Sequence, residues 1–149
     1  MKAVVCTRYG APDVLEIKEV PTPAVTATDL LVRVYASAVN SADVRSRSLD
    51  VSGPMKIAMR LLIGWKAPRQ PILGTVFSGE VVGLGENTSG FQAGDRVYGC
   101  SPGLRYGCHA EYLTIKADST VALMPKNASI EEAVALLFGE TTTQKRITH

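Results

Sequence analysis

The chain has 149 residues, of which 46% are hydrophobic and 20% charged, and its formal net charge is +2. This length supplies one domain with a real core, and so small a charge argues against nucleic acid as a partner. No apolar run approaches the roughly 18 residues of a membrane span, and three cysteines without a signal-peptide core favour a reducing, cytoplasmic location.

Three short strands are expected at the beginning of the chain. Residues 2–9 form a β-rich run, which the turn-forming residues 10–13 end. Leu15 and Ile17 alternate with charged residues, and this period-two pattern predicts a half-buried strand. Residues 30–37 predict a firmer strand with apolar and polar side chains on opposite faces.

The β pattern then breaks. Ser41 is a candidate N-cap for a short helix that ends near Arg47. The next stretch is the least regular of the chain, and within it residues 55–65 mix apolar side chains with basic ones. Such a run suits an apolar flap over a hydrophobic substrate, with Leu61 and Trp65 as candidate substrate contacts. It suits equally well the ordinary covering of a barrel end.

The stretch from Gly74 to Gly99 carries the most information. It places seven glycines among short β-favouring runs, at positions 74, 79, 83, 85, 90, 94 and 99. Glycine tolerates positive φ and close approach of another backbone, so this spacing is typical of a tightly coiled sheet or small barrel. Gly94-Asp95 adds a strong turn dipeptide before the next apolar run.

The remaining elements follow from the same rules. Further strands are expected at residues 110–116 and 120–124. Ser129 and Glu132 have the spacing of a capping box, which predicts a helix that starts at residue 129 and buries one face. Residues 143–149 are polar and continue no apolar pattern.

The order of these pieces resembles the medium-chain dehydrogenase/reductase superfamily. Residues 1–5, 74–97 and 107–112 fall where that family places them in its GroES-like catalytic domain. The resemblance covers residues 1–142 and implies a mainly β fold with a few helices, a GroES-like partly open β-barrel. In the family a Rossmann domain follows, but no glycine fingerprint for a dinucleotide occurs here. Residues 143–149 are therefore expected to be an off-pattern tail.

The resemblance also bears on metal binding. Zinc-dependent members carry a Cys near the short helix and a Gly-His-Glu in the glycine-rich strand. Here Asn40 stands at the first position and Thr75 and Val76 at the second, and neither Thr75 nor Val76 suits zinc. Cys100 and Cys108 are too few for a structural zinc lobe of four cysteines. With His109 beside them a metal site stays conceivable, but two thiols and a neighbouring His are more often bystanders. The expectation is therefore no zinc and no other metal.

Ala38-Val39-Asn40 followed by Asp43 is similar to the signature of the zinc-independent quinone oxidoreductase (zeta-crystallin-like) branch. This resemblance implies an oxidoreductase that transfers hydride from NADPH to a small-molecule quinone or α,β-unsaturated carbonyl. NADH stays open as the cofactor. The branch usually has an Asp at the position of Val76, so this departure leaves the hydrogen bonding of the cleft unsettled.

The resemblance implies two contacts to the nicotinamide. Asn40 is expected to reach it with an amide that offers donor and acceptor groups, and its alternative role is to cap the helix that follows. Gly139-Glu140-Thr141-Thr142 is similar to the family's Gly-x-Thr turn. Thr142, or failing that Thr141, is therefore expected to meet the nicotinamide carboxamide.

Two other functions stay open at this point. One is a zinc-dependent alcohol dehydrogenase domain that takes its ligands from elsewhere. The other is a free-standing binding module like a co-chaperonin, which would not need Asn40 or the turn at residues 141–142. Full-length family members often form homodimers, so a homodimer is expected for the full-length form. The 149-residue chain alone is expected to be inactive, because dinucleotide affinity comes chiefly from the Rossmann domain.

Overall fold

The computed structural model describes residues 1–101, 105–135 and 137. The fold is mainly β with a few helices, as the sequence predicts. The elements in chain order are β1 (Lys2–Cys6), the 3-10 helix η1 (Pro12–Val14), β2 (Leu15–Glu19), β3 (Asp29–Ser37), α1 (Ser41–Ser48), α2 (Pro54–Ile63), β4 (Val76–Leu84), β5 (Arg96–Cys100), β6 (Tyr112–Lys116) and β7 (Val121–Leu123).

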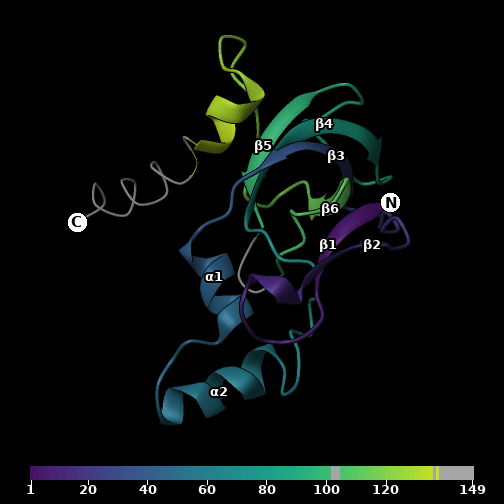
Figure 1. The fold of residues 1–149 in the computed structure, drawn as a ribbon. Helices are drawn as coiled ribbons and strands as arrows, with labels where there is room; N and C mark the ends of the chain where they lie inside the picture. The colour runs from purple at the N-terminus through teal and green to yellow at the C-terminus, as the bar shows by residue number, and fades with distance from the viewer. Residues whose placement is uncertain (102–104, 136, 138–149) are drawn as a thin grey trace, which may run out of the picture.

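The strands form two antiparallel sheets that curl toward one another (Figure 1). The smaller sheet pairs β1 with β2, and the larger has the strand order β6-β3-β4-β5-β7. Isolated bridges join Ala3 to Ala110 and Val5 to Ile72, so β1 lies against the chain on both sides of β4 and β5. The sheets do not close on one another, which confirms the partly open GroES-like barrel.

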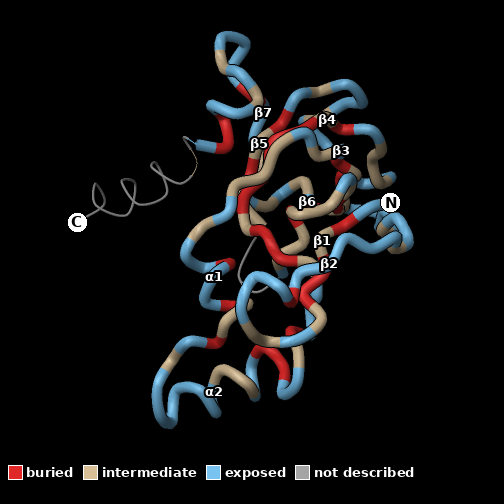
Figure 2. Tube along the Cα trace, in the orientation of Figure 1, coloured by how far each residue is buried: buried red, intermediate tan, exposed pale blue. Residues whose placement is uncertain are grey.

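The core is built on the five-stranded sheet, and Figure 2 shows buried stretches along β3, β4 and β5. Leu30, Val32, Phe77 and Val81 are all fully buried. The β-branched Val32 and Val81 and the aromatic Phe77 suit a pleated, half-covered surface. The prediction that residues 74–99 are β rather than helical is confirmed, since they contain β4 and the start of β5.

Two of the helices differ from expectation. The N-cap of α1 is Asn40 rather than Ser41, because the Asn40 side chain reaches the free backbone N–H groups of the first turn. The stretch expected to be irregular contains α2, which begins with Pro54 after Gly53 at φ 63°. Proline suits the first turn of a helix, where its missing N–H costs nothing. Figure 1 shows α2 lying apart from both sheets.

The strand predicted at Leu15 and Ile17 is present as β2, but it is exposed rather than half-buried. All five residues of β2 are exposed, and Ile17 keeps 76% of its surface accessible. The strand β2 pairs only with β1, at the edge of the two-stranded sheet.

The capping box at the start of the last described helix is confirmed. Ser129 N–H donates to Glu132 Oε2 at 2.9 Å, and Glu132 N–H donates to Ser129 Oγ at 3.1 Å. Residues 130–135 are helical, and Ala133 and Val134 are buried. Among the described residues, no helix has the length and apolar character that a membrane crossing requires.

Candidate functional site

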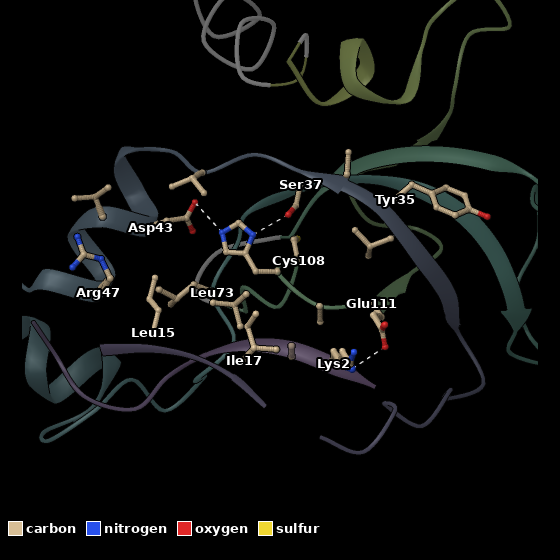
Figure 3. Close-up of a pocket in the computed structure, with 18 residues that line it drawn as sticks. Lys2, Leu15, Ile17, Tyr35, Ser37, Asp43, Arg47, Leu73, Cys108 and Glu111 are labelled. Atoms are coloured by element: carbon tan, nitrogen blue, oxygen red, sulfur yellow. Dashed lines mark hydrogen bonds and ion pairs between the residues drawn. The ribbon is translucent and has the colours of Figure 1, made fainter. Parts of the chain in front are cut away.

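A cavity of about 500 Å³ lies between the two sheets and the first turns of α1 (Figure 3). Its apolar wall comes from both sheets and from α1, and includes Leu15, Ile17, Val34, Val39 and Leu73. This explains the exposed apolar residues of β2, whose side chains face the cavity rather than a packed layer. The size and lining suit a small apolar ligand.

Several polar side chains also line the cavity, and three of them, Ser37, Asp43 and His109, form a cluster. His109 lies at its centre, with Nδ1 2.9 Å from Ser37 Oγ and Nε2 3.7 Å from Asp43 Oδ2 (Figure 3). The side chains of His109 and Asp43 are only 12% and 4% exposed. The end of β3 and the start of α1, which are close in sequence, thus meet the distant chain before β6 at one imidazole.

Local structure holds Asp43 in place. Its Oδ2 accepts from Asn40 N–H at 3.0 Å in the capping box of α1, and its Oδ1 accepts from Gly74 N–H at 2.9 Å. Gly74 has φ 99°, and a Cβ there would lie 2.7 Å from the backbone nitrogen of His109. Only glycine therefore lets the chain pass close enough to bind Asp43 and leave room for His109.

These contacts decide the charge of Asp43. Burial by itself would raise the pKa of its carboxyl, but His109 and the backbone N–H groups of Asn40 and Gly74 outweigh burial and hold that pKa below its usual value. Asp43 is therefore ionised at neutral pH. It places a buried negative charge beside the imidazole.

We expect the variant Asp43→Asn to lose part of the acid sensitivity of folding. A carboxyl with a lower pKa in the folded state stabilises the fold above its unfolded pKa, near 3.8, and this stabilisation is lost as the pH falls through the folded pKa. Urea unfolding of both proteins from pH 7 to pH 3 measures the effect. The free energy of unfolding of the wild type should fall more steeply below about pH 4. Parallel curves would contradict the assigned charge.

The cysteines lie near this site but have no reactive character. Burial raises the pKa of the Cys108 thiol to about 12, and the nearby Cys100 adds to the shift. Burial also raises the pKa of Cys100. Both thiols are therefore protonated at neutral pH, whereas nucleophilic attack requires a thiolate.

Asn40 fills the capping role that the sequence left open beside the cofactor role. Its Oδ1 accepts from Ala42 N–H at 2.8 Å and Asp43 N–H at 3.3 Å, and its Nδ2 donates to Thr75 Oγ1. Since a primary amide has two N–H donors, one Nδ2 hydrogen has no partner among the described residues. Capping therefore leaves one amide donor of Asn40 available.

The other predicted site residues lie elsewhere. Leu61 of α2 and Trp65 just after it are 62% and 57% exposed and lie outside the lining of the cavity. The Arg60 guanidinium lies 5.9 Å from the Trp65 ring, close enough for a cation–π contact. Thr141 and Thr142 lie outside the described residues. Asn40 does not line the cavity itself, but it is hydrogen-bonded to Asp43, which does. Leu61 and Trp65 do not line the cavity.

Sequence reasoning considered His109 only as a conceivable metal ligand beside Cys100 and Cys108, and it assigned no role to Ser37. The only signal available was the spacing Asn40-x-x-Asp43, which is a capping box and also places a carboxylate beside the cavity. Among the residues that the structure describes, no group of three or more His, Cys, Asp or Glu side chains is placed to hold a metal ion.

Comparison with known proteins assigns this barrel to a family of domains. The sequence profile of the alcohol dehydrogenase GroES-like domain matches residues 26–126. The chain belongs to this family, as an N-terminal domain of the quinone oxidoreductase branch of the medium-chain dehydrogenase/reductase superfamily.

Individual relatives agree with this placement. The chain is 29% identical to the mitochondrial NAD(P)H oxidoreductase RTN4IP1 of Dictyostelium discoideum, over 99% of this chain and 40% of the relative. It is 32% identical to the 2-methylene-furan-3-one reductase of Solanum lycopersicum, over 91% and 34%. The structure of the quinone oxidoreductase from Coxiella burnetii superposes with a TM-score of 0.75 at 29% identity, over 91% of this chain and 40% of that one. The chain thus spans no more than about two fifths of these relatives.

Proposed function

We propose that this chain is the catalytic-domain portion of an NADPH-dependent oxidoreductase that reduces quinones or α,β-unsaturated carbonyls by hydride transfer. The observation that carries the proposal is the apolar cavity with a single buried polar cluster, Ser37–His109–Asp43, in a domain of this family. An apolar ring or chain would contact the walls, and its one carbonyl oxygen would face the polar cluster. The names of relatives, which include quinone oxidoreductases and a furanone reductase, support this substrate class.

Residues 1–142 form the catalytic domain in this proposal, and the cofactor is held chiefly by a nucleotide-binding domain outside it. When bound, the cofactor supplies the hydride. The free amide hydrogen of Asn40 and the hydroxyl of Thr142, or of Thr141, hold the nicotinamide carboxamide. NADPH is favoured and NADH is the alternative, and the name of the Dictyostelium relative supports NAD(P)H in general.

The remaining parts of the proposal concern the surroundings of the site. Leu61 and Trp65 on and after α2 form an apolar flap that contacts the substrate. The reaction needs no zinc, because Asn40, Thr75 and Val76 stand where zinc ligands are expected. The full-length form acts in the cytoplasm as a homodimer.

The variant Leu61→Ser tests the substrate flap in a protein that joins a relative's nucleotide-binding domain after Thr142. We expect KM for an apolar quinone to rise about threefold to tenfold with kcat nearly unchanged, since loss of uniform binding raises KM alone. Leu62→Ser is the matched control, because Leu62 is its neighbour on α2 and is 63% exposed. Equal effects of the two variants on KM would contradict a specific role for Leu61.

A further inference from the structure

Ser37 connects the cavity to the buried polar cluster. It lies half-buried at the end of β3, lines the cavity, and has its Oγ 2.9 Å from His109 Nδ1. We propose that the Ser37 hydroxyl binds the carbonyl oxygen of the substrate and gives it a proton that His109 replaces. This inference rests on the proposed function and adds the source of the proton that accompanies the hydride.

The direction of the hydrogen bonds follows from Asp43. Its ionised carboxyl already accepts two backbone N–H groups, and its Oδ2 lies 3.7 Å from His109 Nε2. Nε2 is buried and has no hydrogen-bond partner among the described residues. A lone pair on Nε2 would face a negative oxygen, whereas an N–H there is attracted to it. One imidazole proton therefore stays on Nε2.

The second imidazole proton decides what Ser37 can do. With only Nε2 protonated, Nδ1 is an acceptor and the Ser37 hydroxyl donates to it. With both nitrogens protonated, Nδ1–H donates to Ser37 Oγ, and the hydroxyl hydrogen is free to point into the cavity. The doubly protonated imidazole beside the Asp43 charge is thus the state that presents a donor to a carbonyl oxygen.

The other charged and titratable groups around the cavity are engaged elsewhere. Arg47 of α1 donates to the carbonyl of Gly10. Glu111 accepts from the backbone N–H of Lys2 at 2.8 Å. The Cys108 thiol, next to His109 in sequence, has a pKa raised to about 12 by burial and stays neutral. Tyr35 donates its hydroxyl to Glu80 Oε2 at 3.1 Å, and the Lys2 side chain also lines the cavity. Among these groups, Ser37 and His109 are the pair in which a hydroxyl at the cavity is hydrogen-bonded to an imidazole.

The chemical step balances in atoms and electrons. A hydride from the reduced nicotinamide cofactor reaches the β-carbon of an enone, and the carbon–carbon π pair shifts to give an enolate. The enolate oxygen takes the Ser37 hydroxyl proton while Ser37 Oγ takes the proton of His109 Nδ1. The products are an enol, which tautomerises to the saturated ketone, and a neutral His109 with its proton on Nε2. Solvent then restores the second imidazole proton.

A pair of probes tests the carbonyl contact in the 149-residue chain itself. Acetophenone and ethylbenzene have similar shapes, but only acetophenone has a hydrogen-bond acceptor. NMR titration should show acetophenone binding about tenfold more tightly at a pH where His109 is doubly protonated, which corresponds to about 1.4 kcal/mol. The preference should disappear under conditions where the imidazole ¹⁵N signals of His109 show a neutral ring. A preference that is absent, or constant with pH, would overturn the proposal.

Three variants assign the effect to these residues. Ser37→Ala should bind both probes equally, with unchanged affinity for ethylbenzene, whereas the control Ser89→Ala, in an exposed loop, should retain the wild-type preference. Asp43→Asn offers an amide donor to Nε2, so imidazole ¹⁵N shifts should show that the proton is no longer fixed there. An acetophenone preference that survives in Ser37→Ala would overturn the proposal.

Measurements of enone reductase activity distinguish a failure of this inference from a failure of the proposed function. In the joined protein, Ser37→Ala should lower kcat for an enone at least tenfold and flatten its pH profile. Turnover that continues unchanged in Ser37→Ala would reject the proton path and leave the proposed function standing. A pH-dependent acetophenone preference in a joined protein without any reductase activity would support the carbonyl contact and count against the proposed function.

Discussion

Replacing Gly79 with alanine is expected to prevent the chain from folding stably. Gly79 is buried in the middle of β4, where it pairs with Val34 of β3 and Val97 of β5. A Cβ at this position would lie 2.0 Å from the backbone oxygen of Arg33 and 3.0 Å from Val32 Cγ1. Because the first contact is with backbone, relief requires β3 and β4 to separate, and these strands carry the core residues.

Urea unfolding followed by circular dichroism measures this effect. We expect Gly79→Ala to lose more than about 3 kcal/mol of unfolding free energy, beyond ordinary overpacking and near the extreme for single substitutions. The matched control is Val82→Ala on the same strand, where the side chain is 41% exposed and the loss should stay near 1 kcal/mol or less. A Gly79→Ala protein within about 1 kcal/mol of the wild type would contradict the β3–β4 packing.

The same close packing explains why the barrel could be predicted from sequence. Glycines are spaced through Gly74–Gly99 because backbones approach one another there, and this need is visible in the chain itself. The turn at Gly94, with φ 91°, and the capping box at Ser129 are likewise local signals. The expected barrel and the start of the last described helix are therefore confirmed.

Elements whose environment is set by distant parts of the chain were harder to predict. The sequence of β2 alternates as a half-buried strand does, yet its apolar residues line a cavity instead of a packed layer. The helix α2 lies in a stretch that reads as irregular, because basic residues interrupt its apolar run. Its residues Leu61 and Trp65 are exposed, and their contact with a substrate stays a prediction.

The site could be predicted only where its parts are local. Asn40 and Asp43 are three residues apart and belong to one capping box, so a motif contains both. Ser37 and His109 are separated by 72 residues, and only the pairing of β3 with β6 brings them together. A lone histidine in a sequence gives no sign of such a contact. The roles of Thr141 and Thr142 concern residues outside those that the structure describes.

The central claim is that this barrel supplies one half of a reductase site and a nucleotide-binding domain supplies the other. Within the described residues, no strand leads through a glycine-rich turn into a helix that could meet a pyrophosphate. A few hydrogen bonds of about 1 kcal/mol each at the nicotinamide end do not offset an association cost of roughly 4 kcal/mol or more. The chain alone should therefore bind NADPH more weakly than about 1 mM.

The most direct measurement is the rate of NADPH oxidation with a quinone or enone, before and after a relative's nucleotide-binding domain is joined behind Thr142. The chain alone should show no turnover, and the joined protein should show sustained turnover. Asn40→Ser, which can still cap α1, should lower the joined protein's rate about tenfold, as loss of about 1.4 kcal/mol of transition-state binding would. Micromolar NADPH binding or turnover by the chain alone would contradict this account, as would a folded, NADPH-binding joined protein that reduces no quinone or enone.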